Sequence, residues 1–137
     1  MTTRRVVLGL CAVVVHLFLI TQLLYGFDAK QLEQFRKTNK CQKCDLSNAK
    51  LANLDLSYAD LSSANLTGAD LSAATLYSAN LSGAVLVNAN LTNANLYDAN
   101  LSKADLKGAS VAGANLHNAI WPNGKPCKMG SVGSCKQ

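Results

Sequence analysis

A five-residue repeat runs without a gap from Cys44 to Asn118. Leu stands at the centre of every pentad except the one centred on Val111, and Ala stands two residues before almost every centre. A period of five fits neither regular element, because a helix would spread these leucines around its circumference and a straight strand would put successive leucines on opposite faces. The chain must therefore turn once per pentad. The pattern predicts a solenoid, in which each unit buries its leucine only by stacking on the next.

The order Ala, Asp or Asn, Leu and two variable residues resembles the pattern of the pentapeptide repeat family. The match covers 75 of the 137 residues. This resemblance implies an all-β solenoid, specifically a right-handed quadrilateral parallel β-helix with four pentads to a coil. The β-helix is then expected over 41–118 as just under four coils. At about 4.8 Å per coil, such a stack is roughly 15 to 20 Å tall.

The segments on either side of the repeats are expected to cover the two open ends of the stack. Residues 28–40 predict a short cap helix with Asp28 as its N-cap, and Leu32 and Phe35 on one face against the first coil. Residues 119–137 predict a C-terminal cap loop. There Trp121 falls where the next Leu would stand, which indicates an aromatic plug over the last layer. Prolines and glycines follow it, as is typical of a loop.

Four cysteines lie at these ends, and the register assigns each a direction. Cys41 and Cys44 occupy a Leu and an Ala position, so both should face inward. A disulfide needs Cα atoms within about 7 Å, and the two cysteine pairs belong to opposite ends of the stack. Local pairing is therefore predicted, Cys41 with Cys44 and Cys127 with Cys135. The strings CQKCDLSNAKL and WPNGKPCKMGSVGSCK also resemble the cysteine-bearing ends of small exported bacterial and cyanobacterial members of the family.

Residues 1–27 are typical of a targeting or anchoring segment. Arg4 and Arg5 precede 22 residues without a formal charge, long enough for a transmembrane helix and also compatible with a signal peptide. We favour the uncleaved anchor because no good cleavage site follows. Both interpretations leave the arginines in the cytoplasm and put the repeats on the non-cytoplasmic side, in a periplasm or a thylakoid lumen. Such compartments favour oxidised cysteines.

Charge is divided unevenly along the chain. The formal net charge of +5 arises in the flanks, whereas the repeats carry more Asp than Lys. Basic flanks of this kind fit a contact with anionic lipid or acidic partners next to a membrane, but we favour solvated cap surfaces that keep the ends soluble. The repeats lack a basic stripe, which argues against a nucleic-acid partner. DNA mimicry, as in the gyrase-protecting members of the family, implies a long acidic rod in the cytoplasm and is kept only as a remote alternative.

The sequence contains almost no residues arranged for catalysis, so we predict that the protein is not an enzyme. Its two histidines are His16, in the N-terminal segment, and His117, on the repeat surface, and no Ser or Cys has a His and an acid at a readable spacing. The carboxylates are scattered among the faces, so neither a metal site nor a cofactor is expected. No small-molecule substrate is identified. These features favour a non-catalytic scaffold that binds an unidentified protein partner, with the membrane contacted through the N-terminal segment.

The outward positions are where such a partner would bind. Residues twenty apart should stack on one face, which predicts a ladder of Tyr77, Tyr97 and His117, with Ser57 completing the column. An exposed aromatic ladder is a candidate binding surface for a protein or a glycan. Stacked aromatics also serve simply as packing between neighbouring strands.

One enzyme-class alternative remains, a thiol–disulfide redox protein. Cys41 and Cys44 form a Cys-x-x-Cys motif, which is a redox pair where it opens an exposed helix. Here the motif follows the expected helix and enters the repeat in register, which favours a structural bridge. A zinc site built from all four cysteines would require the two pairs to meet across the stack.

Overall fold

The computed structural model describes residues 29–137. The predicted transmembrane or signal segment over 1–27, and Asp28 as a helix cap, lie outside the described residues. Within 29–137, no helix is long and apolar enough to cross a membrane.

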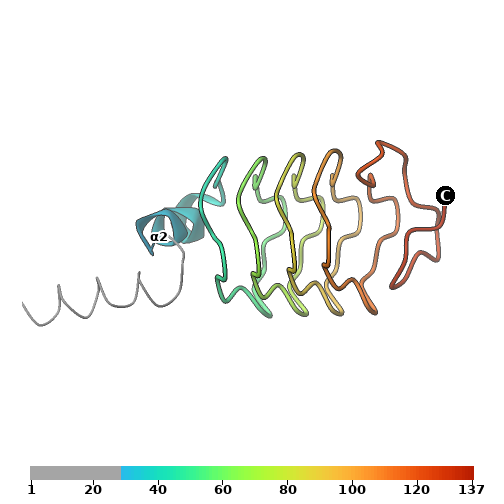
Figure 1. Ribbon diagram of the computed structural model, residues 1–137, viewed down its shortest axis with the longest axis horizontal. Helices are drawn as coiled ribbons and strands as arrows, with labels where there is room; N and C mark the ends of the chain where they lie inside the picture. Colours follow the sequence, from blue (N-terminus) through green and yellow to red (C-terminus); the bar gives the residue numbers. More distant parts are fainter. Residues whose placement is uncertain (1–28) are drawn as a thin grey trace, which may run out of the picture.

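The repeats form a parallel β-helix whose coils stack along one axis (Figure 1). Each parallel bridge joins residues twenty apart, as in Asp60 with Asn80 and Asn80 with Asn100. Four pentads therefore make one four-sided coil, as the resemblance implied. The N–H of each central leucine from Leu46 to Leu101 donates to the coil above, for example from Leu61 to the Asn80 carbonyl at 2.8 Å. Each side contributes one bridged residue rather than a longer strand.

The stack extends slightly beyond the predicted range of 41–118. A continuous series of parallel bridges runs from Lys40 through Asp60, Asn80 and Asn100 to Ile120, which is four complete turns rather than just under four. The difference arises at both ends because the bridged residue is the one before each pentad centre. Cys41 joins the first coil as a leucine would, donating its N–H to the Asp60 carbonyl at 2.7 Å.

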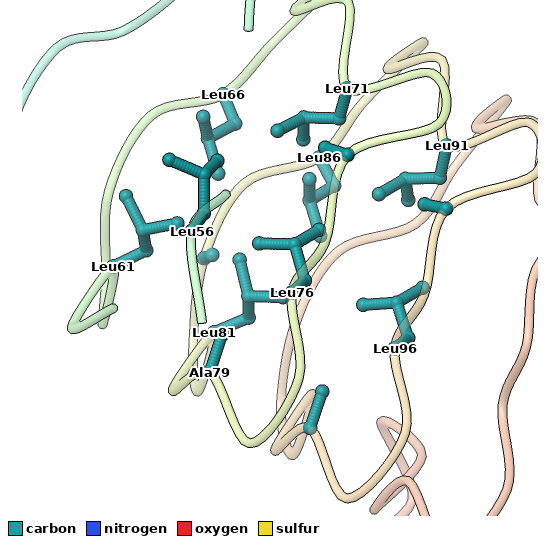
Figure 2. Packing of buried hydrophobic residues seen from close by; sticks show 14 of the residues in the cluster. Leu56, Leu61, Leu66, Leu71, Leu76, Ala79, Leu81, Leu86, Leu91 and Leu96 are labelled. Atoms are coloured by element: carbon teal, nitrogen blue, oxygen red, sulfur yellow. The ribbon is translucent and has the colours of Figure 1, made fainter. Parts of the chain in front are cut away.

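The interior is a column of leucines with alanines beside them. Leu61, Leu81 and Leu101 are completely buried, as are most of the alanines two residues before each centre. Figure 2 shows the leucines of successive sides pointing into one shared interior. Since no other element covers these side chains, each coil depends on its neighbours for its apolar contacts.

The corners depend on a residue with left-handed backbone, two positions after each centre. Asn48, Asn88 and Gly68 hold φ values of 57°, 56° and 66° there, as Asn and Gly do at low cost. Where the residue before a centre is Asn or Asp, its side chain supports the same turn by accepting a backbone N–H. Asn80 accepts from Ser82 at 3.1 Å and Asn100 from Ser102 at 3.0 Å.

Helix α2, Ala29–Thr38, lies at the N-terminal end of the stack (Figure 1). Phe35 is buried in the core and Leu32 packs against it half-buried, as the shared face predicted. The Gln31 side chain accepts the Asp45 N–H at 2.6 Å. The helix ends before the predicted residue 40 because Asn39 adopts φ 56° and its side chain turns to the Ser57 carbonyl at 2.8 Å.

The C-terminal segment folds back over the last coil in antiparallel pairing (Figure 1). Val132 pairs with Asn115, and Pro126 pairs with Ile120. Trp121, the predicted plug, packs against the core but stays partly exposed. Cys127 and Ser131 are the residues of this segment that become fully buried. The end is therefore covered by the folded-back chain as well as by the indole.

Candidate binding surface

One side of the stack carries a row of aromatic rings in contact. Tyr77 and Tyr97 lie 5.5 Å apart between ring centroids, with their planes nearly parallel at 13°. His117 follows Tyr97 at 6.0 Å in an edge-to-face arrangement. The structure thus brings together all three residues that the twenty-residue spacing assigned to the ladder. Centroid distances of this size are those of favourable aromatic pairs.

A fourth ring, Tyr58, joins this row where Ser57 was expected. Its centroid lies 5.5 Å from that of Tyr77, edge to face. Ser57 turns aside instead, because its hydroxyl donates to the Asp55 carboxylate at 2.6 Å. We call Tyr58, Tyr77, Tyr97 and His117 the aromatic ladder from here on.

The twenty-residue spacing did not predict Tyr58 because this residue stands at a corner, two positions after its pentad centre. Its backbone is left-handed, with φ 58°, and such a corner side chain can lean along the stack. The available signal was chemical: a large aromatic residue in a corner position that elsewhere in the repeats holds Asn, Gly, Ser, Ala, Asp or Lys. With 70% of its surface exposed, Tyr58 is the most open ring of the ladder.

Backbone and side-chain hydrogen bonds hold the ladder in place. Asn95 accepts the N–H of Tyr97 at 3.3 Å, and Asn115 accepts the N–H of His117 at 3.2 Å. The two asparagines are joined to each other at 3.1 Å. At the other end, hydrogen bonds from the Ser57 hydroxyl and N–H keep the pKa of the Asp55 carboxyl below its usual value. The rings therefore project from an ordered, hydrogen-bonded side of the coil.

His117 links the ladder to the C-terminal segment. Its Nε2 accepts a hydrogen bond from the backbone N–H of Gly130. The ladder and the folded-back end of the chain thus form one connected surface.

The chemistry available on this surface is that of recognition. Tyr77 and Tyr97 use their faces against each other, so they present ring edges and hydroxyl groups outward, beside the exposed ring of Tyr58. Tyrosine is suited to protein interfaces because it offers apolar area and a hydrogen-bonding group together. Across residues 29–137, no group of three or more His, Cys, Asp and Glu side chains is placed to hold a metal ion.

The cysteines form two disulfides at opposite ends of the stack. Cys41 is bonded to Cys44 and Cys127 to Cys135, with Cα separations of 5.2 and 5.1 Å. This is the predicted local pairing, and it leaves these four residues no arrangement as a single zinc site. Cys41 is buried while Cys44 is half-exposed.

A cavity of about 350 Å³ lies beside the first disulfide, between α2 and the first coil. Both cysteines line it together with Lys40 and Lys43, and glutamines complete its wall. The Cys-x-x-Cys motif is therefore next to basic groups, but it forms a corner of the coil and does not open a helix.

Comparison with known proteins identifies the same repeat. The family model described as pentapeptide repeats matches in eight copies over residues 44–83, 76–111 and 84–120. Together these cover residues 44–120, which is more than half of the chain. No curated protein matches the chain.

Several solved structures are similar in sequence. A pentapeptide repeat protein from Nostoc is 36% identical, covers 64% of this chain and 78% of its own, and has a TM-score of 0.40. A second, from the cyanobacterium Cyanothece, is 35% identical over 60% of this chain and 63% of its own, with a TM-score of 0.38. A third, from the thylakoid lumen of Arabidopsis thaliana, is 29% identical over 63% of this chain and 71% of its own, also with a TM-score of 0.38.

Proposed function

Because the chain belongs to the pentapeptide repeat family, we propose that it is a non-catalytic interaction module, displayed outside the cytoplasm by its N-terminal segment. From family membership we also propose that the coil is right-handed. The aromatic ladder is the observation that supports the proposed interaction function. It gathers four rings on one side of the stack, and it is the feature best suited to bind a protein.

The placement of the module rests on residues 1–27. An uncharged stretch after two arginines supports an anchor or a signal peptide, with the repeats on the far side of the membrane. The two disulfides agree with an oxidising compartment. Intact mass spectrometry of the natively expressed protein tests this directly. It distinguishes a retained segment from a cleaved one and counts the oxidised thiols.

Site-specific photo-crosslinking in the organism that makes the protein tests the ladder. A benzophenone amino acid replaces Tyr97 in one variant and Ser102 in a second. Both positions directly follow a pentad centre, but Ser102 stands on the next side of the same coil. The proposal expects a discrete crosslinked protein from position 97 only.

A variant that lacks two rings of the aromatic ladder provides the control. The changes Tyr58→Ser and Tyr77→Ser leave the buried leucines untouched and should abolish the crosslink from position 97. Equal products from positions 97 and 102, or no product from either, would show that this side has no dedicated partner.

A thiol–disulfide redox function is the second candidate, supported by the cavity beside Cys41 and Cys44. Basic neighbours such as Lys40 and Lys43 favour a thiolate, which is the reactive form of a cysteine. The motif is nevertheless built into a coil corner, and Cys41 is buried. We expect a reduction potential below about −300 mV, as structural disulfides have, and no reduction of insulin or glutathione exchange. A higher potential with turnover would favour the redox function instead.

DNA mimicry receives little support from the distribution of carboxylates. Asp45, Asp55, Asp60 and Asp70 stand on four different sides of the coil, as their five-residue offsets require. A double helix presents its phosphates in continuous rows, and these aspartates form none. The hypothesis stays a remote alternative.

A further inference from the structure

The C-terminal end of the β-helix is closed on two of its four sides. At Asn115, the Leu116 N–H donates to the Ser131 carbonyl at 2.8 Å, and the Gly133 N–H donates to the Ala114 carbonyl at 2.9 Å. At Ile120, the Trp121 N–H donates to the Lys125 carbonyl at 2.9 Å, and the Ala119 carbonyl accepts the Cys127 N–H at 2.8 Å. The chain thus adds one antiparallel layer over these two sides.

The other two sides of the last coil present the same groups without that layer. Asp105 lies between the Ala104 carbonyl and the Leu106 N–H, and Ser110 lies between the Ala109 carbonyl and the Val111 N–H. No hydrogen bond from residues 29–137 reaches any of these four groups. One coil lower, the equivalent N–H groups of Leu86 and Leu91 are both paired at 2.8 Å. We call residues 104–112 the open edge, because Gly113 next to them already lies against Gly133 of the folded-back segment.

The apolar interior is also incompletely covered here. Leu106 and Val111 are only partly buried, whereas Leu86 and Leu91 directly below them are completely buried. An unpaired edge above a partly exposed core is the usual template for an added strand.

The space left at the open edge indicates what kind of partner can bind there. The segment from Lys125 to Gly133 already fills the next layer over the Asn115 and Ile120 sides. A second copy brought flat against this end would be held away from the open edge by that segment and by its own. A single extended strand is about one layer, or roughly 4.8 Å, thick and fits beside it.

Charge indicates what kind of strand. Around the last coil and the folded-back segment, five exposed lysines stand against one aspartate, Asp105; they are Lys103, Lys107, Lys125, Lys128 and Lys136. Acidic side chains pointing outward from an added strand would meet this basic surface.

We propose that the open edge binds an extended acidic segment of a partner protein by strand addition. The Leu106 and Val111 N–H groups donate to the segment, the Ala104 and Ala109 carbonyls accept from it, and its inward side chains cover Leu106 and Val111. This surface lies at the end of the stack and does not depend on the aromatic ladder.

A synthetic peptide of two acidic pentads, acetyl-AELEGAELEG-amide carrying a fluorophore, is the probe. It spans the length of the open edge, and its lysine counterpart AKLKGAKLKG has the same backbone with the opposite charge. Anisotropy titration against the full chain in detergent should show saturable binding of the acidic peptide and at least tenfold weaker binding of the basic one.

Two proline variants separate the edge from general effects. Val111→Pro removes an N–H that has no internal partner, so binding should weaken at least tenfold. Ala112→Pro is the matched control, because it places proline one residue later, at the second position of the turn that Ala114 closes onto Val111, as Pro122 already does after Trp121. Its affinity should stay within about twofold of the wild type.

Hydrogen exchange on the unmodified chain gives a readout that does not depend on variant folding. At saturating acidic peptide, exchange of the Leu106 and Val111 amides should slow at least tenfold, while the Leu86 and Leu91 amides stay unchanged. Equal binding by the two proline variants, protection elsewhere only, or self-association without peptide binding would overturn the proposal.

Discussion

The interior column makes a sharp prediction about where a leucine matters. Leu81 lies between Leu61 below and Leu101 above, and all three are completely buried. Leu81→Ala removes three methylene equivalents, worth about 0.8 kcal/mol each, which accounts for about 2.4 kcal/mol. A cavity between two filled layers cannot collapse readily, so the total loss should approach the upper range for such changes, about 3 to 5 kcal/mol.

The matched change at the end of the same kind of column is Leu106→Ala. Its side chain is only partly buried, so the loss should be about 1 to 2 kcal/mol, in proportion to the smaller area withdrawn from water. Chemical denaturation of the full chain in detergent, followed by far-ultraviolet circular dichroism, measures both. Equal losses, or a larger loss at Leu106, would refute the view that stacked neighbours supply the stability of each coil.

Three further predictions concern the turns, the carboxylates and the end of the stack. Ala73 holds a left-handed corner at φ 53°, so Ala73→Gly should raise the unfolding free energy by up to about 1 kcal/mol in the same denaturation assay. Hydrogen bonds from Ser72 lower the pKa of Asp70 from its usual 3.8. Its contribution is therefore complete above that pH and is lost as pH falls through the lowered pKa, so melting temperature should fall less steeply below about pH 4 in Asp70→Asn, which keeps the acceptor oxygen. Removing the C-terminal disulfide by the double change Cys127→Ser and Cys135→Ser should cost about 2 to 3 kcal/mol. That exceeds the cost of the same change at the first disulfide, because its closed loop is longer, eight residues against three.

Much of the fold was predictable because a five-residue period leaves the backbone few options. A side chain recurring every fifth residue can face one interior only if the chain turns once per pentad. The resemblance to the pentapeptide repeat family implied four pentads to a coil, and that coil length determines which residues stack. Tyr77, Tyr97 and His117 could be placed together for this reason, although they are far apart in sequence. The local cysteine pairing followed from the same register.

What could not be predicted depends on side chains at corners and on the path of the last segment. Tyr58 joins the ladder from a corner, whereas the side chain of Ser57 at the column position bonds to Asp55. The fold-back after Trp121 depends on hydrogen bonds between residues outside the repeat, such as those of Cys127 and Ser131 with the last coil. No period relates these residues to the coils, so the sequence pattern contains no register for them.

The two ends of the stack meet the same physical requirement differently. A β-helix leaves an edge of unpaired backbone groups wherever its repeat stops, and such an edge invites pairing with other chains. At the N-terminal end, α2 places Phe35 over the first layer and Gln31 on the Asp45 N–H. At the C-terminal end, the chain covers only the sides of Asn115 and Ile120, although the covering segment is fastened by a disulfide and by the contact of Gly130 with His117. A cap fastened at two points, yet spanning only half of the edge, blocks end-to-end stacking of identical copies while leaving room for one strand.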